Sequence, residues 1–165
     1  MLRLKVKVLM IQIENNYLNH DLLLNIEKIC SSKDFQWIIN DWQNLHLQHF
    51  FVEEKGKKVC FFTNEIIGQI LKNLKAEYVL ESSITLFTKK SEMNEFDCVS
   101  DFLKDKDYKT FLLILNSCNG YTRIHGLKQI ETKRNMAIFI DKPIPFVNTN
   151  TTNENCRGVL AIHYQ

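Results

Sequence analysis

One short segment in the second half of the sequence carries residue types suited to nucleophilic chemistry. Cys118, Arg123 and His125 lie close together in sequence, just after the apolar run Thr110–Leu115. Such a run predicts a central strand, and sheet folds place ligands beyond their strand ends. A thiol beside an imidazole can attack an electrophile while a guanidinium binds an anion. One hypothesis is therefore a small hydrolase or nuclease acting on nucleic acid or a phosphate ester.

The residues around this cluster favour a structural turn instead. Ser117–Gly120 reads Ser-Cys-Asn-Gly, a turn signal, and the residues after it resemble a strand. A phosphate site would need the N-terminus of a helix there. The sequence also has no glycine-rich phosphate loop, dinucleotide-binding fingerprint or zinc-protease motif. We therefore predict no cofactor, and the sequence favours binding over turnover.

Histidine and cysteine spacing gives no metal site. His46 and His49 fall within a predicted strand, where an odd separation sends side chains to opposite faces. The sequence has 5 cysteines, an odd number, widely spaced and without a Cys-x-x-Cys pair. This pattern argues against a secreted disulfide framework and against a zinc knuckle. We predict a cytoplasmic protein without a bound metal.

Charge and hydropathy argue against two further classes of protein, those that bind nucleic acid and those that span a membrane. The net charge is +2, with 21 basic residues against 19 acidic ones, whereas nucleic-acid binders usually concentrate basic charge. No uncharged apolar run approaches the ~18 residues that cross a bilayer. We therefore expect neither nucleic-acid binding nor membrane insertion.

The hydrophobic pattern indicates one α/β (or α+β) domain over residues 1–165. A mixed sheet of about seven strands with about three or four helices is expected, since strand and helix patterns alternate along the chain. Strands are predicted over 2–13, 78–87, 110–115, 121–125, 136–141 and 158–164, and a hairpin over 47–63. Helices are predicted near 22–30, 33–44, 66–74 and 91–103, a short helix or loop over 127–133, and a Pro/Asn-rich loop over 142–155.

The sequence is similar in profile to a known class of bacterial proteins. It is short, has few glycines, and is rich in Asn, Ile and Lys, as AT-rich genes of mobile elements are. Ile13–Leu18 resembles the Val-Glu-Asn-Asn sequence that introduces toxin domains in contact-dependent growth inhibition systems. In its overall profile the chain resembles the immunity proteins of those systems, which implies binding and occlusion of a cognate toxin. Trp37, Glu53 and Glu54 are the residues expected to contact such a protein partner.

Overall fold

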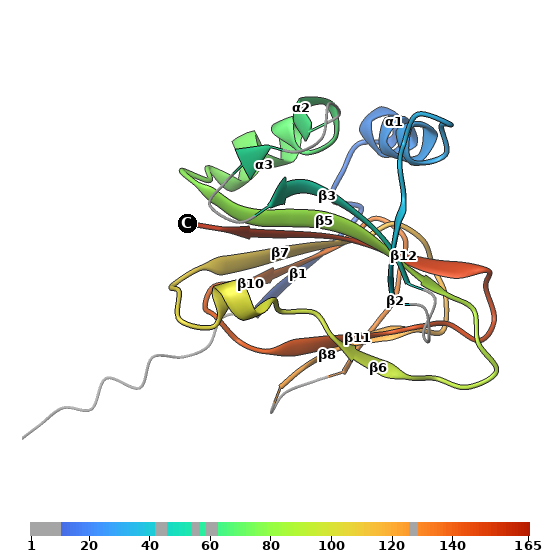
Figure 1. Ribbon diagram of the computed structural model, residues 1–165. Coiled ribbons are helices and arrows are strands. Elements are labelled where there is room, and N and C mark those ends of the chain that lie inside the picture. The colour runs from blue at the N-terminus through green and yellow to red at the C-terminus, as the bar shows by residue number, and fades with distance from the viewer. Residues whose placement is uncertain (1–10, 42–45, 54–56, 59–62, 126–128) are drawn as a thin grey trace, which may run out of the picture.

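The computed structural model describes residues 11–41, 46–53, 57–58, 63–125 and 129–165. Two β-sheets face each other, and helices cover the outer face of the larger sheet (Figure 1). The larger sheet runs in the order β1 (Ile11–Asn15), β10 (Met136–Ile140), β7 (Lys109–Ile114), β12 (Cys156–Tyr164), β5 (Val79–Thr88), β3 (His46–Glu53) and β2 (Ile38–Asp41), with β4 (Lys57–Lys58) also paired to β3. The smaller sheet runs β6 (Glu95–Asp97), β11 (Phe146–Thr149), β8 (Tyr121–Ile124) and β9 (Gln129–Glu131).

The connections between the two sheets define a jelly roll. From β5 onward the chain supplies β5, β7, β10 and β12 to the larger sheet and β6, β8, β9 and β11 to the smaller one. The pairings between these described strands are antiparallel. Eight antiparallel strands shared between two sheets in this way form a double-sheet jelly roll. Strands β1, β2, β3 and β4 extend its larger sheet.

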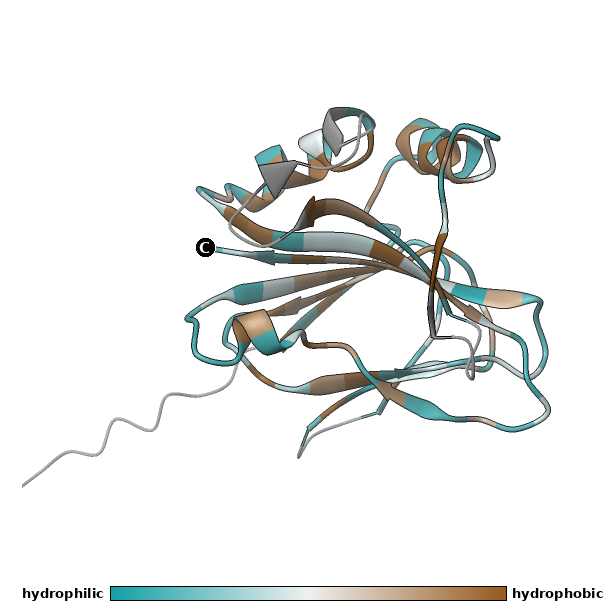
Figure 2. Cartoon of the chain, in the orientation of Figure 1, coloured by the Kyte–Doolittle hydropathy of each residue, from teal (hydrophilic) through white to brown (hydrophobic). Residues whose placement is uncertain are grey.

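Strand β7 shows why the larger sheet carries a core on each face. Phe111 and Leu113 belong to the cluster that packs under the helices, whereas Leu112 and Ile114 belong to the cluster between the sheets. All four side chains are fully buried, as the period of two in a strand requires. The predicted buried strand is confirmed here. Figure 2 shows apolar stretches in the strands of the larger sheet and mostly hydrophilic residues in the turns that connect them.

Helix α1 (His20–Cys30) follows the local signals in the sequence. The Asn19 side chain caps it by accepting a hydrogen bond of 2.8 Å from the Leu22 amide. Leu23 and Ile26 lie one turn apart and pack against the larger sheet. Helices α2 (Thr63–Ile66) and α3 (Gly68–Leu74) cover the same face. The predicted helices in these two regions are confirmed.

The predicted fold class is wrong, because strands dominate and they pair antiparallel. The helix predicted over 33–44 is edge strand β2, paired with the start of β3, although 42–45 lie outside the described residues. The helix predicted over 91–103 is strand β6 followed by the short 3-10 helix η2 (Asp101–Leu103). Apolar residues spaced three or four positions apart occur in extended segments as well as in helices. The spacing alone therefore predicted a helix where the chain forms a strand.

Two other predicted elements differ in extent. The hairpin over 47–63 is present as β3 and β4, while 54–56 and 59–62 lie outside the described residues. The predicted loop over 142–155 contains β11, which pairs with β6 and β8 at the centre of the smaller sheet. In the described part of the chain, no helix is long and apolar enough to span a bilayer.

Candidate functional site

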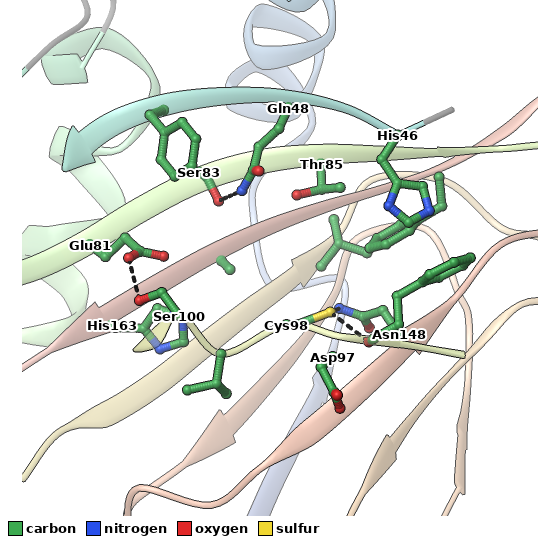
Figure 3. A pocket seen from close by; sticks show the side chains of 16 residues that line it. His46, Gln48, Glu81, Ser83, Thr85, Asp97, Cys98, Ser100, Asn148 and His163 are labelled. Carbon is green, nitrogen blue, oxygen red and sulfur yellow. Dashed lines mark hydrogen bonds between the residues drawn. The ribbon is translucent and has the colours of Figure 1, made fainter. Parts of the chain in front are cut away.

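A groove lies between the two sheets along the inner face of β5. Its volume is about 500 Å³, within the range of roughly 300–1,000 Å³ found for small-molecule sites. Every second residue of β5 lines it, and the flanking strands β3 and β12 add side chains with the same alternation (Figure 3). These residues are Glu81, Ser83, Thr85 and Phe87 from β5, His46, Gln48 and Phe50 from β3, and Val159, Ala161 and His163 from β12.

One end of the groove is polar and buried. The carboxylate of Glu81 accepts a hydrogen bond of 2.8 Å from the Ser100 hydroxyl, and Glu81 is 8% exposed. His163 pairs with Glu81 across β12 and β5, and its Nδ1 lies 3.0 Å from the Thr110 hydroxyl. Burial lowers the pKa of His163 to about 4, because a desolvated imidazole resists protonation. This histidine is therefore neutral at physiological pH.

The opposite end of the groove is aromatic. The rings of Phe87 and Phe96 stack with centroids 5.8 Å apart, and the His46 ring meets Phe96 edge-on at 4.0 Å. His46 pairs with Phe87 across β3 and β5, so the sheet register fixes this cluster. Such a surface offers apolar contact area.

The smaller sheet supplies the wall facing β5. Asn148 Nδ2 donates a hydrogen bond of 3.2 Å to Cys98 Sγ, and this thiol donates in turn to the Phe96 carbonyl. Burial raises the pKa of Cys98 to about 11. The sulfur is therefore a neutral thiol at physiological pH rather than the thiolate that nucleophiles and metal ligands require.

A buried arginine ties this wall to the strands behind it. Arg157 is 0% exposed, and it donates to Thr132 Oγ1 at 2.9 Å, Thr122 Oγ1 at 2.7 Å and Asn148 Oδ1 at 3.1 Å. Its guanidinium also lies 5.9 Å from the centre of the Phe87 ring. Burial lowers its pKa to about 10, so the group stays charged. Arg157 fixes the orientation of Asn148 and thereby the groove wall.

The structure does not assemble the cluster predicted around Cys118. Cys118 precedes β8 and His125 follows it, so the two residues lie at opposite ends of that strand. Arg123, on β8, forms an exposed ion pair with Glu95. Arg123 and His125 share a shallow surface depression with Glu95 that excludes Cys118. The described contacts do not join Cys118 to Arg123 and His125, and the hydrolase or nuclease hypothesis at this cluster stays a prediction.

The contacts predicted between a partner and Trp37, Glu53 and Glu54 stay predictions. Trp37 packs edge-on against Phe35 with ring centroids 4.9 Å apart, at the margin of the core under the helices. The side chain of Glu53 and all of Glu54 lie outside the described residues.

The groove residues were not predicted from the sequence, although one signal for them was present. Glu81, Ser83 and Thr85 place polar groups at alternate positions of a strand that was predicted correctly. In a two-sheet sandwich the inner positions are normally apolar. Polar residues at alternate positions of a buried strand therefore indicated a binding groove.

Comparisons with known proteins identify the fold. No known family profile matches the chain, and no curated protein matches its sequence. An oxidoreductase of the 2OG-Fe(II) oxygenase family from Burkholderia pseudomallei superposes with a TM-score of 0.68 at 14% identity, over 95% of this chain and 84% of that one. A prolyl-4-hydroxylase from Pseudomonas putida gives 0.63 at 13%, over 94% and 92%.

A third solved structure has the same architecture. The prolyl hydroxylase from Trichoplax adhaerens, solved with a peptide fragment of a hypoxia-inducible factor, gives a TM-score of 0.63 at 9% identity, over 93% of this chain and 82% of that one. The chain thus has the jelly-roll fold of these oxygenases. This finding corrects the predicted resemblance to immunity proteins and the toxin-binding function drawn from it.

The groove does not fit the iron centre that this fold suggests. Non-haem Fe(II) oxygenases hold the metal with two histidines and one carboxylate. The sequence has five histidines, all at described positions, and only His46 and His163 line the groove. They pair with Phe87 and Glu81 respectively, which lie about 20 Å apart along β5 at a rise of about 3.3 Å per residue.

Two imidazoles on one metal must bring their nitrogens within about 4 Å of each other, because each bond is about 2 Å long. His46 and His163 stand at opposite ends of the groove (Figure 3). Within the described residues no group of three or more His, Cys, Asp or Glu could hold a metal ion. We therefore derive no reaction step through iron.

Proposed function

We propose that this chain binds a small organic molecule in the groove between its two sheets, using side chains alone and no iron centre. The observation that carries the proposal is the polar stripe of β5, which faces a cavity of about 500 Å³ at a place where a sandwich normally closes its core.

Burial of these polar groups has a free-energy cost. Glu81 and Ser83 are 8% and 5% exposed, and His163 is 1% exposed. Removing such groups from water disfavours folding unless hydrogen bonds compensate, and an apolar residue at each position would avoid the cost. Neighbouring inner positions, Phe87 and Val159, are apolar and belong to the core between the sheets. Ligand recognition supplies a reason for the change from apolar to polar along one strand.

The oxygenase chemistry named for the similar structures has less support here. The two groove histidines are too far apart for one metal, as described above. The described groove residues also include two carboxylates, Glu81 and Asp97, and neither Lys nor Arg. A dianion such as 2-oxoglutarate would meet repulsion from these carboxylates, and the nearby Arg157 already donates its hydrogen bonds to Thr122, Thr132 and Asn148. Protein partners, the absence of nucleic-acid binding, and a cytoplasmic location stay predictions of the sequence.

Thermal unfolding of metal-free protein against a panel of small metabolites tests the proposal. After EDTA treatment and desalting, at least one ligand class should raise the melting temperature, because binding to the folded state alone stabilises it. The change Ala161→Phe, which places a ring in the groove, should abolish this shift, while Ser91→Phe at an exposed turn should leave it intact. A shift that survives Ala161→Phe would place the ligand elsewhere and contradict the proposal.

A further inference from the structure

The groove extends along β5. Glu81, Ser83, Thr85 and Phe87 line it in succession, and alternate residues of a strand are about 7 Å apart, so the groove follows roughly 20 Å of β5. Along that length the lining changes from the polar side chains of Glu81 and Ser83 to the aromatic ring of Phe87. This gradient suits an elongated ligand with one polar end and one apolar end.

The polar end carries negative charge. The Glu81 carboxylate is held by Ser100, and burial together with the charge of Glu81 raises the pKa of Tyr108. His163 beside it is neutral, because burial lowers its pKa to about 4. A ligand group at this end is favoured when it is positively charged and donates hydrogen bonds.

The aromatic end of the groove favours an apolar group of the ligand over a charged one. Phe87 and Phe96 offer apolar surface, but the Arg157 guanidinium already lies over the Phe87 ring. A second cation against the same ring would be repelled by this arginine. The hydrocarbon part of a ligand therefore belongs at the aromatic end, and its charged group belongs at Glu81.

Resting on the proposed binding function, we propose that the groove recognises a linear primary amine. Its ammonium group donates to Glu81, its chain lies along Ser83 and Thr85, and its apolar end contacts Phe87 and Phe96. Two sources share this chemistry: a free alkylamine, and the side chain of lysine in a peptide.

Titration calorimetry with three ligands of matched length tests the charge preference on the full wild-type chain. Hexylamine should bind at least about tenfold more tightly than hexan-1-ol, since a charge-assisted hydrogen bond adds that much, and hexanoate should not bind. Equal or tighter binding of the alcohol or the acid overturns the amine inference but leaves the proposed function standing. If no ligand class binds or shifts the melting temperature, the proposed function itself fails.

Two variants with the same change of charge test the role of Glu81. Glu81→Gln should weaken hexylamine binding about tenfold to a hundredfold and leave hexan-1-ol binding unchanged. Glu131→Gln, at an exposed position of β9 outside the groove, should change neither. An unchanged amine affinity in folded Glu81→Gln protein would overturn the inference. If Glu81→Gln does not fold, the wild-type comparison of amine and alcohol decides.

The source of the amine is separated by a second pair of ligands. Nα-acetyl-lysine N-methylamide carries a lysine side chain on a peptide-like backbone, whereas pentylamine carries the same amine and hydrocarbon chain without it. Tighter binding of the first points to a peptide, and tighter binding of the second points to a free alkylamine. Binding of neither would overturn the inference.

Discussion

His46 and His163 line one groove from opposite ends, because they pair with Phe87 and Glu81 at positions far apart on β5. The strand register therefore prevents these two imidazoles from binding one metal ion. The fold resembles that of iron oxygenases, but we propose that the groove binds its ligand through side chains alone.

Iron should not bind at the groove. We expect protein that has been incubated anaerobically with Fe(II) and then desalted to retain no more iron than the buffer by elemental analysis. The reason is the separation of about 20 Å along β5 between the two groove histidines. Stoichiometric iron that is lost in both His46→Ala and His163→Ala would contradict this prediction.

Acid should destabilise the protein through His163. Its pKa is lowered from 6.5 to about 4 in the folded state, so the unfolded chain takes up a proton first as the pH falls. The contribution of the neutral imidazole is complete above about pH 6.5 and is lost towards pH 4, by about 3 kcal/mol. Urea unfolding at pH 7 and pH 4 measures this loss.

Two histidine variants serve as controls for that loss. In His163→Gln the difference between the two pH values should shrink by about the same 3 kcal/mol. In His20→Gln, at an exposed position of α1, it should match wild type. Equal pH dependence in wild type and His163→Gln would show that another group is responsible.

Arg157 should be essential for stability. Arg157→Met leaves Thr122, Thr132 and Asn148 without their buried donor, and we expect a loss of about 3–5 kcal/mol in the free energy of unfolding. The matched control is Arg134→Met, which breaks a half-exposed ion pair with Glu27 and should cost about 1 kcal/mol or less. Denaturant unfolding of both variants checks this, and comparable losses would show that the buried network contributes little.

Gly120 should not tolerate a side chain. A Cβ at this position would lie 2.6 Å from Arg157 Cδ and 2.7 Å from the Asn150 carbonyl oxygen. Gly120→Ala is expected to cost about 1–3 kcal/mol through overpacking. Gly158→Ala, whose nearest neighbour is the Leu115 side chain at 3.2 Å, should cost less in the same unfolding assay. The reverse order would contradict the packing described here.

The sequence predicted elements that depend on local pattern. The run Thr110–Leu115 corresponds to β7 because a strand buried on both faces must be apolar throughout. Asn19 and the stripe through Leu23 and Ile26 likewise specify α1 without distant contacts. Burial and capping act within a few residues, so single-sequence patterns reveal them.

Elements that depend on distant partners were not predictable in this way. Ile38 and Ile39 suit a helix by spacing, yet they form an edge strand because β3 is available to pair with them. Phe146–Thr149 looks like a polar loop, but β6 and β8 pair with it and Arg157 binds its Asn148 side chain. Long-range pairing overrode local preference at both places.

The residues of the site show the same difference between local patterns and long-range pairing. His46 and Glu81 lie far apart in sequence and come to one groove only through the register of β3 against β5. The cluster of Cys118 and His125 was close in sequence, yet β8 separates its members. Proximity along the chain was therefore misleading, whereas polar residues at alternate positions of a buried strand were informative.

The most direct test of the central claim is the melting temperature of EDTA-treated protein with hexylamine, alone and with Fe(II) plus 2-oxoglutarate added anaerobically. We predict that hexylamine alone raises the melting temperature, that Ala161→Phe removes this effect, and that Fe(II) with 2-oxoglutarate adds nothing. Stabilisation that requires both Fe(II) and 2-oxoglutarate would contradict the account and indicate an iron oxygenase.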